Sequence, residues 1–188
     1  NSFKILNNSG SLKINTFCLF IRIQIMIIKL KNKDTLIVGE FKLKCCVGRK
    51  GISKNKSEGD FQTPSGKFKL GNLYWRSDRV KKPETKLFCK KIKKNMGWCN
   101  DSNSVYYNKE IKTNKNVKHE KLYRHDHKYD LFILIKYNYL KTKKNKGSAI
   151  FIHLTKNYKA TAGCIAVSKK DFLILNKILK KNSQIIIG

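Results

Sequence analysis

His153 and Cys164 are the residues whose types and placement could most directly do chemistry. The histidine lies near the end of an apolar run over 148–154, and the cysteine directly precedes a second short apolar run over 165–167. Both runs are typical of buried strands. If the strands are neighbours, the imidazole can take the thiol proton and leave a nucleophilic thiolate. The alternative is a core cysteine and a hydrogen-bonded structural histidine, since both residue types are commonly buried.

Gly163 favours the catalytic interpretation. A glycine directly before the cysteine lets the backbone approach a substrate closely, and its amide could stabilise a developing oxyanion. This interpretation predicts that the Cys164 thiol has a pKa well below that of an ordinary thiol. A cysteine that is merely buried should be inert.

Two motifs together resemble the catalytic domain of the L,D-transpeptidase (YkuD-type) family. His153 followed by Thr161-Ala162-Gly163-Cys164 is similar to the family's strand histidine and Ser/Thr-x-Gly-Cys turn. Upstream, the stretch from Glu58 to Phe68 looks like the family's Gly-Asp-x-x-Thr-Pro-x-Gly-x-Phe motif. Two motifs in the expected order are more specific than either alone. The resemblance extends from about Gly48 to the C-terminus.

The resemblance implies a mainly β fold, a barrel or sandwich with one C-terminal α-helix. It also implies cysteine acyl transfer on peptidoglycan stem peptides through a thioester acyl-enzyme, which forms cross-links. Cys164 would be the nucleophile, His153 the general base and acid, and Gly163 a backbone donor to the oxyanion. No cofactor or metal would be needed, the location would be the periplasm or cell envelope, and β-lactams such as carbapenems would acylate the nucleophile.

Two positions depart from the family pattern. Many members carry a histidine two residues before the cysteine and an arginine two residues after it, where this chain has Ala162 and Ala166. The chain therefore resembles a divergent branch. Two alternatives stay open: an L,D-carboxypeptidase that trims stem peptides, and a non-catalytic basic module that binds cell wall or nucleic acid.

Charge and length limit the partners and the domain organisation. The 188 residues carry a formal net charge of +30, and 40% of them are hydrophobic, which suits one ordinary core. We expect a single domain over 26–188 and give no interpretation of residues 1–25. The excess charge is nearly all lysine and is spread along the chain. This pattern favours general attraction to an anionic cell wall surface over a nucleic-acid site.

No targeting or membrane segment is evident in the sequence. The hydrophobic stretch over 17–28 is interrupted by Arg22 and Gln24, and it is too short for a membrane-spanning helix. The sequence predicts neither a transmembrane segment nor a clear signal peptide. A location in the cell envelope therefore rests on the resemblance alone, and a cytoplasmic location stays open.

Metal binding is not expected. The six cysteines show no Cys-x-x-Cys spacing, and no zinc-type pattern surrounds His119 or the segment 124–127. Cys45 and Cys46 should face opposite sides of a strand, so we expect only one of them to be in the core.

The candidate substrate-binding residues are Thr161, Arg124, Tyr107 and His119. Thr161 belongs to the cysteine motif, and Arg124 could bind a substrate carboxylate through two hydrogen bonds. Tyr107 could contact peptide or sugar from a long loop region over 71–128. The alternative is that these are solvated loop residues or surface aromatic side chains.

The remaining pattern predicts the elements that position this site. Short strands are expected over 27–30, 36–38, 41–47, 67–70 and 184–187, and the apolar run 129–137 predicts the most buried strand. Ser168 is predicted to cap a helix that extends to about Lys181, with Asp171 completing the cap.

Overall fold

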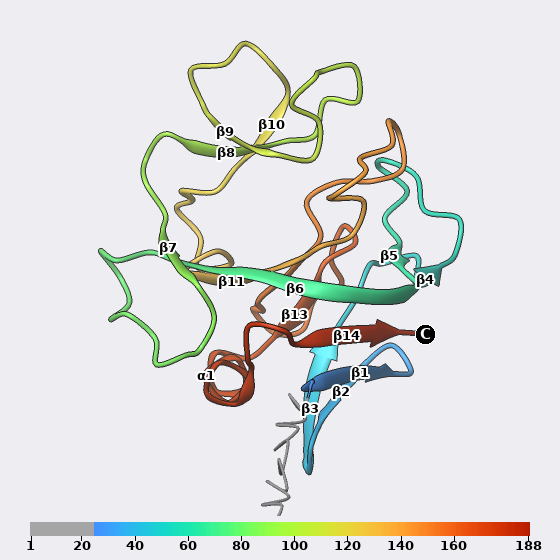
Figure 1. The fold of residues 1–188 in the computed structure, drawn as a ribbon, viewed down its shortest axis with the longest axis vertical. Helices are drawn as coiled ribbons and strands as arrows, with labels where there is room; N and C mark the ends of the chain where they lie inside the picture. The colour runs from blue at the N-terminus through green and yellow to red at the C-terminus, as the bar shows by residue number, and fades with distance from the viewer. Residues whose placement is uncertain (1–24) are drawn as a thin grey trace, which may run out of the picture.

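The computed structural model describes residues 25–188, in which short strands form a closed sheet (Figure 1). The order is β11-β12-β13-β3-β2-β1-β14-β6, and pairing of β6 with β11 closes the ring into a barrel. β7 extends the outer edge of β6. The strands are β1 (Ile27–Lys31), β2 (Thr35–Val38), β3 (Phe41–Cys46), β4 (Ile52–Ser53), β5 (Thr63–Pro64), β6 (Gly66–Trp75), β7 (Cys89–Lys91), β8 (Met96–Cys99), β9 (Glu110–Lys112), β10 (His119–Lys121), β11 (Leu131–Ile135), β12 (Phe151–Leu154), β13 (Ile165–Val167) and β14 (Gln184–Ile187). The predicted β-rich fold class is confirmed.

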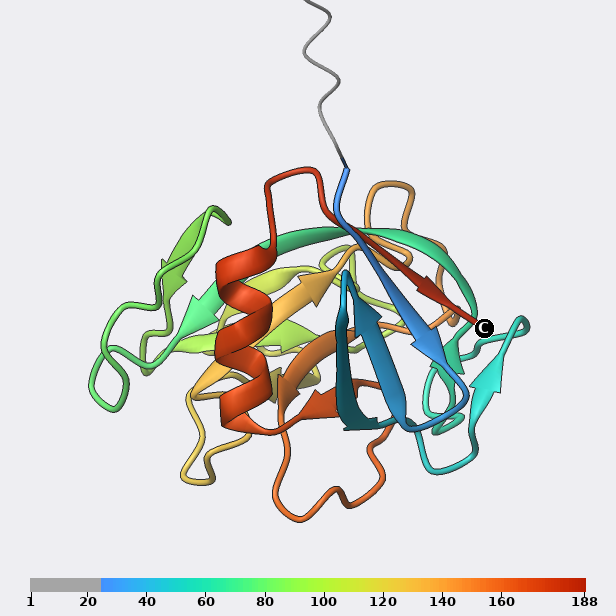
Figure 2. The ribbon, with the colours of Figure 1, turned by 90° about the horizontal axis from the view of Figure 1, so that it is seen from below.

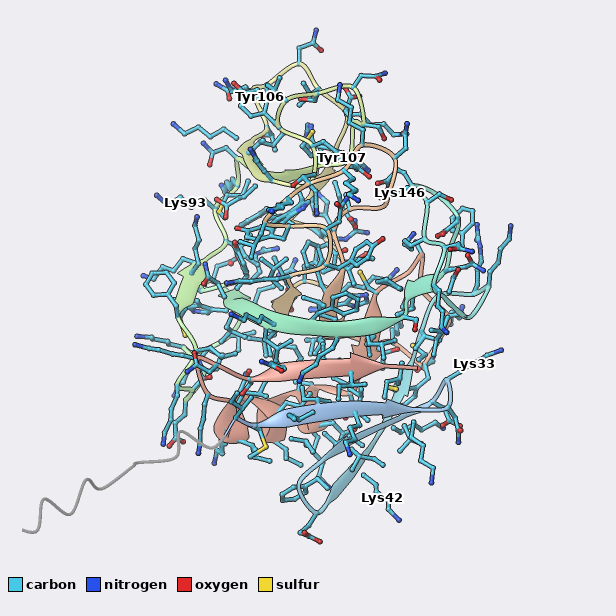
Figure 3. The ribbon with its side chains drawn as sticks, turned by 45° about the vertical axis from the view of Figure 1, so that its right-hand side comes forward. Lys33, Lys42, Lys93, Tyr106, Tyr107 and Lys146 are labelled. Atoms are coloured by element: carbon cyan, nitrogen blue, oxygen red, sulfur yellow. The ribbon has the colours of Figure 1, made fainter. Side chains whose placement is uncertain are left out.

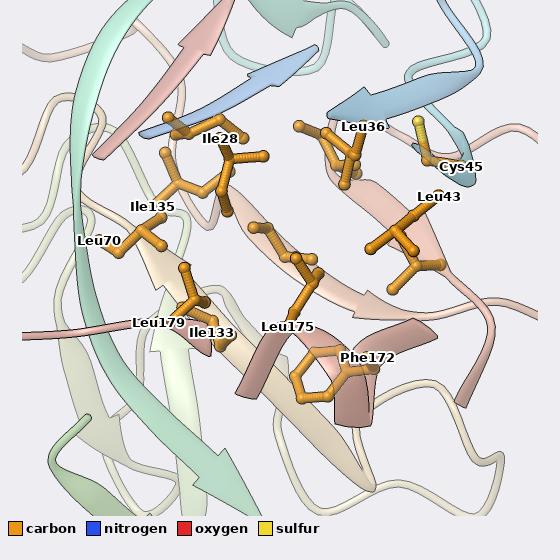
Figure 4. Close-up of a cluster of buried hydrophobic side chains, with 14 of the residues drawn as sticks. Ile28, Leu36, Leu43, Cys45, Leu70, Ile133, Ile135, Phe172, Leu175 and Leu179 are labelled. Carbon is orange, nitrogen blue, oxygen red and sulfur yellow. The ribbon is translucent and has the colours of Figure 1, made fainter. Parts of the chain in front are cut away.

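The barrel wall has two buried faces on the side of β11 and β12. Leu131, Ile133 and Ile135 join the main core inside the barrel. Ile133 and Ile135 are labelled there in Figure 4. Phe132 and Leu134 alternate with them and join a second apolar cluster outside the barrel. Because both faces are covered, the whole of β11 is buried, which confirms the prediction of a fully buried strand here.

The C-terminal helix α1 (Lys169–Ile178) closes one side of the barrel (Figure 2). Its N-terminus is capped as predicted: Ser168 Oγ accepts a 3.1 Å hydrogen bond from the Asp171 amide. Phe172, Leu175 and Leu179 pack into the barrel core. The helix ends earlier than predicted, since Leu179 is already in an extended conformation.

The middle section contains more regular structure than the sequence indicates. β6 continues to Trp75, and β10, β8 and β9 form a separate three-stranded sheet, seen above the barrel in Figure 1. The prediction that this section consists of loops was therefore wrong in part. Strands of three or four residues such as Glu110–Lys112 and His119–Lys121 carry too few apolar residues to show an alternating pattern.

Asn108 joins this small sheet to the barrel. Its Oδ1 accepts hydrogen bonds from Trp98 Nε1 (3.0 Å) and from the Ala149 amide (3.1 Å). Its Nδ2 donates to the carbonyl oxygens of Tyr137 (3.1 Å) and Asn138 (2.6 Å). With 2% of its surface exposed, the side chain is a structural connector, and it holds Ala149 beside the site described below.

The lysines lie mostly on the outside. Lys33, Lys42 and Lys93 extend from the barrel and its loops into solvent (Figure 3). Within residues 25–188, no helix has the length and apolar character needed to cross a membrane. Most of the hydrophobic stretch 17–28, which was predicted not to span a membrane, lies outside the described residues.

The paired cysteines of β3 face opposite sides, as predicted. Cys45 lies in the barrel core, and Cys46 lies on the other face, where its thiol donates to the Lys159 carbonyl at 3.2 Å. The expectation that only one of them is in the core was wrong, since both are buried: Cys45 is 2% and Cys46 8% exposed. The chain segment around Lys159 covers Cys46, which no strand pattern could indicate.

Candidate active site

β12 and β13 place the histidine and the cysteine on the same face of the barrel. The two strands are parallel neighbours, with Ile152 opposite Ile165 and His153 opposite Ala166. Residues 151 and 153 share the outer face of β12, and the Phe151 amide lies 3.4 Å from Cys164 Sγ. The prediction that the two strands are adjacent is confirmed.

A cavity of about 610 Å³ contains both residues in its lining. Its walls come from the outer face of β12 and β13, the segment 155–164, residues 56–61, and the small sheet around Glu120. This volume is in the range of cavities that enclose a small ligand or a peptide segment. The site therefore has a thiol, a potential base and room for a substrate.

Thr161 shapes the turn that carries Cys164. Its hydroxyl donates to the Cys164 carbonyl at 2.6 Å and accepts from the Gly163 amide at 3.0 Å. The amide of Gly163 is thus already engaged and does not point freely at a substrate, contrary to the predicted oxyanion role. Among residues 25–188 no acceptor is found for the Cys164 amide, so this N–H is free to donate to a ligand.

The upstream motif lies directly beneath this turn. A Cβ atom at Gly163 would come within 2.8 Å of the Gln62 carbonyl oxygen, and Gly163 has φ +146°. Thr63 Oγ1 accepts from the Gly48 amide at 2.9 Å, which fixes the same segment to the end of β3. The motif from Glu58 to Phe68 therefore supports the cysteine turn, and the two motifs form one structural unit.

We expect Gly163→Ala to destabilise the protein and displace Cys164. The methyl group meets fixed backbone, and alanine at positive φ costs about 1–2 kcal/mol before any clash. The free energy of unfolding from denaturant titration measures the loss. Gly66→Ala is the matched control, because Gly66 has a similar φ (+137°) but its Cβ would meet the end of the Phe68 side chain instead of fixed backbone. Equal losses in the two variants would contradict the close-packing argument.

His153 is held in an orientation that leaves one nitrogen for chemistry. Nδ1 donates to the Leu154 carbonyl at 2.8 Å, so Nε2 carries the free lone pair. The Tyr129 ring packs edge-on against the imidazole, with 5.4 Å between ring centroids. Burial lowers the pKa of His153 to about 4, so the ring is neutral at pH 7 and can accept a proton.

Cys164 is protonated in the empty site. Its thiol donates to the Ala149 carbonyl at 3.1 Å, and no hydrogen bond to His153 is present among the described residues. Burial raises the pKa of the thiol to about 12, opposite to the predicted direction. The resting pair is thus neutral thiol and neutral imidazole. Proton transfer requires the thiol to turn from Ala149 toward His153. Catalytic hydrogen bonds of this kind commonly form or shorten only when substrate binds.

The buried imidazole predicts a specific pH dependence of stability. The pKa of His153 is about 4 when folded against an ordinary 6.5, so between these values the unfolded chain binds more protons. The free energy of unfolding should therefore fall by about 3 kcal/mol through this group as pH drops from 6.5 to 4. We expect wild type to lose this much relative to His153→Gln, measured by urea unfolding at pH 7 and pH 4. An equal loss in both proteins would contradict the burial of a neutral ring.

The other predicted binding residues lie in different environments. Arg124 lines the cavity, but its guanidinium already binds Asp126 through two hydrogen bonds of 2.9 and 2.6 Å. Tyr107 is 3% exposed and its hydroxyl donates to Glu58 at 2.5 Å, so it supports the site from within. His119 is absent from the cavity lining, and its Nδ1 hydrogen bonds to the Val117 carbonyl. These contacts leave neither Tyr107 nor His119 in a position to touch a substrate.

Sequence reasoning missed several residues of the cavity. Glu58, Glu120 and Tyr129 are among them, and Tyr129 also contacts the His153 imidazole. Glu58 is the first residue of the upstream motif, and this position was the one signal in the sequence that could have identified it. Within residues 25–188, no group of three or more His, Cys, Asp or Glu side chains is arranged to hold a metal ion.

The comparison with known families agrees with this geometry. A family model described as the L,D-transpeptidase catalytic domain, YkuD, matches residues 24–187. No curated protein sequence matches the chain. The matched region includes the closed barrel, the cysteine turn and the motif beneath it. The chain belongs to the YkuD family of L,D-transpeptidase catalytic domains.

Proposed function

We propose that this protein is a peptidoglycan L,D-transpeptidase in which Cys164 is the nucleophile and His153 the general base and acid. The observation that carries the proposal is the placement of both side chains in one cavity by the neighbouring strands β12 and β13. The folded catalytic unit is residues 26–188. No metal or organic cofactor takes part in the steps below.

The chemistry proceeds in two acyl transfers. As Cys164 Sγ attacks the carbonyl carbon of a stem-peptide amide, His153 Nε2 takes the thiol proton. The Cys164 amide donates to the developing oxyanion, since this N–H has no other acceptor among the described residues. The C–N bond breaks, and the departing amine takes the proton from the imidazolium. The resulting thioester is then attacked by an acceptor amine, and His153 again accepts and returns the proton.

The charge of the cavity suits an anionic stem peptide. Lys118, Lys128, Lys156 and Lys159 line it, and no acidic side chain forms an ion pair with them within the described residues. These ammonium groups can bind substrate carboxylates. The lysine-rich exterior would add general attraction to the anionic cell wall, and we propose a location in the cell envelope.

Product analysis tests this proposal. Purified protein is incubated with a stem tetrapeptide that ends in D-alanine, with and without an acceptor stem peptide. Mass spectrometry should find a cross-linked dimer together with released D-alanine. Release of D-alanine without a cross-linked dimer would instead indicate carboxypeptidase activity, in which water takes the place of the acceptor amine.

A non-catalytic basic module is the second candidate. It is favoured by the high pKa of the Cys164 thiol and by alanine at both departures from the family pattern. Such a module would bind insoluble peptidoglycan equally well in wild type and Cys164→Ala and would release no D-alanine. Binding to nucleic acid would be recognised by an affinity that falls steeply with added salt.

A further inference from the structure

Lysines dominate the outer face of one half of the barrel wall. β3, β2, β1, β14 and β6 are consecutive neighbours in the closed sheet, and their core residues alternate with residues that point outward. On three of these strands the outward positions carry six lysines, which we call the lysine band: Lys29, Lys31, Lys42, Lys44, Lys67 and Lys69. None of the five strands contains an aspartate or a glutamate, so this half of the wall has positive charge only.

The register of the strands places part of the lysine band in one row. Lys29 of β1 is opposite Ile37 of β2 on one side and Ile186 of β14 on the other. Ile37 is in turn opposite Lys42 of β3, and Ile186 is opposite Lys67 of β6. The row across the five strands therefore alternates lysine and isoleucine. Because neighbouring strands lie about 4.8 Å apart, successive lysines start from backbone positions about 10 Å apart.

The curvature of this row limits the partners that it can bind. β3 and β6 stand four places apart in a ring of eight strands, so the wall turns between them and their outward side chains point in different directions (Figure 1). A flat bilayer can reach only part of such a row. Double-stranded DNA is too stiff to bend around it, since its persistence length is about 50 nm. A flexible chain can follow the wall and meet each lysine-bearing strand in turn.

The lysine band leads to an open hollow at the end of β3. Cys46 occupies the last outward position of β3 and lines this hollow, whose volume is about 420 Å³. Its charged lining residues are Lys33, Arg49 and Lys50, and among residues 25–188 no acidic side chain lines it. We call it the basic hollow. Ala160 lines both the basic hollow and the candidate active site, so a chain bound here would lie beside the segment that carries the cysteine turn.

The aromatic rings beside the basic hollow are already covered by cations. Lys44 Nζ lies 4.8 Å from the centroid of the Tyr158 ring, and the central guanidinium carbon of Arg49 lies 3.5 Å from that of Phe61. Proteins that bind single-stranded nucleic acid offer open aromatic rings on which the bases stack. The row of lysine and isoleucine contains no such ring, so this surface provides charge without a platform for bases.

Positive charge, curvature and the lack of open aromatic rings together define a flexible polyanion without bases. We propose that the lysine band and the basic hollow bind a linear polymer of sugar phosphates or polyol phosphates, with one phosphate group held in the hollow. Lysine ammonium groups are compact point charges with rotatable donors, so they suit a chain whose phosphates turn freely. This binding uses neither Cys164 nor His153 and is independent of the proposed acyl transfer. It would hold the protein on a surface that carries such a polymer.

The test measures how binding depends on salt. Fluorescently labelled poly(glycerol phosphate) is titrated at several salt concentrations with wild type and with a triple variant that combines Lys29→Gln, Lys42→Gln and Lys67→Gln. Each lysine that neutralises a phosphate of a single-stranded polyanion adds about 0.7 to the slope of log Kd against log salt concentration. We therefore expect the slope to fall by about 2 in the triple variant. A double variant with Lys33→Gln and Lys50→Gln should lower it by about 1.4.

The matched control combines Lys93→Gln, Lys109→Gln and Lys112→Gln, three exposed lysines in and around the small sheet. It removes the same charge and should keep the wild-type slope. Equal falls in the two triple variants would mean attraction by net charge alone and would overturn the proposal, as would wild type that does not bind the polymer.

Two further outcomes would also contradict the proposal. Tighter binding of an oligothymidylate with the same number of phosphates would indicate a nucleic-acid site instead. A wild-type slope in the double variant would remove the basic hollow from the site. Cys164→Ala should bind the polymer as wild type does, so a failure of the proposed acyl transfer leaves these results unchanged.

Discussion

His153→Ala is expected to lower the rate of acyl transfer about 10²- to 10⁴-fold while the protein stays folded. The resting thiol has a pKa of about 12, so almost no thiolate is present at pH 7 without a base. His153 is the neutral base that the cavity provides, and its Nε2 is unencumbered because Nδ1 is bonded to Leu154. The measurement is the single-turnover rate of thioester formation, followed by intact-mass spectrometry after rapid quenching.

His125→Ala is the control for this substitution, since His125 is an exposed histidine outside the cavity. It should acylate at the wild-type rate. Raising the pH should restore part of the rate in His153→Ala, because hydroxide then ionises the thiol directly. If His153→Ala acylates at the wild-type rate at pH 7, a group other than His153 removes the thiol proton of Cys164.

Asn108→Ala is expected to cause the largest loss of stability, about 3 kcal/mol or more in the free energy of unfolding. The substitution removes four hydrogen bonds and leaves the Trp98 indole N–H and the Ala149 amide without an acceptor. Asn108→Ala should also slow acylation, because the carbonyl of Ala149 accepts the hydrogen bond from the Cys164 thiol. Denaturant unfolding followed by tryptophan fluorescence measures the stability.

Two further variants isolate the cause. Asn108 has φ +57°, so Asn108→Gly separates the hydrogen bonds from the backbone strain that alanine adds. Asn103→Ala changes an exposed asparagine in the same loop and should leave stability within about 0.5 kcal/mol of wild type. If Asn108→Gly is as stable as wild type, the side-chain hydrogen bonds do not connect the small sheet to the barrel.

Local patterns in the sequence were sufficient to predict the strands of the barrel and the cysteine turn. Residues 131–135 are apolar throughout because β11 is covered on both faces, and Ser168 with Asp171 is a short-range cap. β12 and β13 are close in the chain, so their adjacency could be expected, but a connection this short gave no reason to expect that they pair in parallel. The fold class followed from these features together with the resemblance.

Contacts between segments that are distant in the chain could not be predicted from the sequence. Tyr107 looks like a recognition residue in a loop, but its hydroxyl lies against Glu58, far away in the sequence. The same holds for Cys164, whose pKa is raised by burial. Each of these properties depends on which segment packs above a residue, and no periodic pattern encodes that.

The measurement that tests the central claim most directly is the intact mass of the protein after exposure to a carbapenem. A strained β-lactam amide opens on attack without losing a leaving group, so the adduct retains the whole inhibitor as a thioester. We predict one adduct in wild type, the same adduct in Cys89→Ala, which lacks a half-buried cysteine outside the cavity, and none in Cys164→Ala. Folded wild-type protein that forms no adduct, or an adduct that persists in Cys164→Ala, would contradict the assignment of Cys164 as the nucleophile.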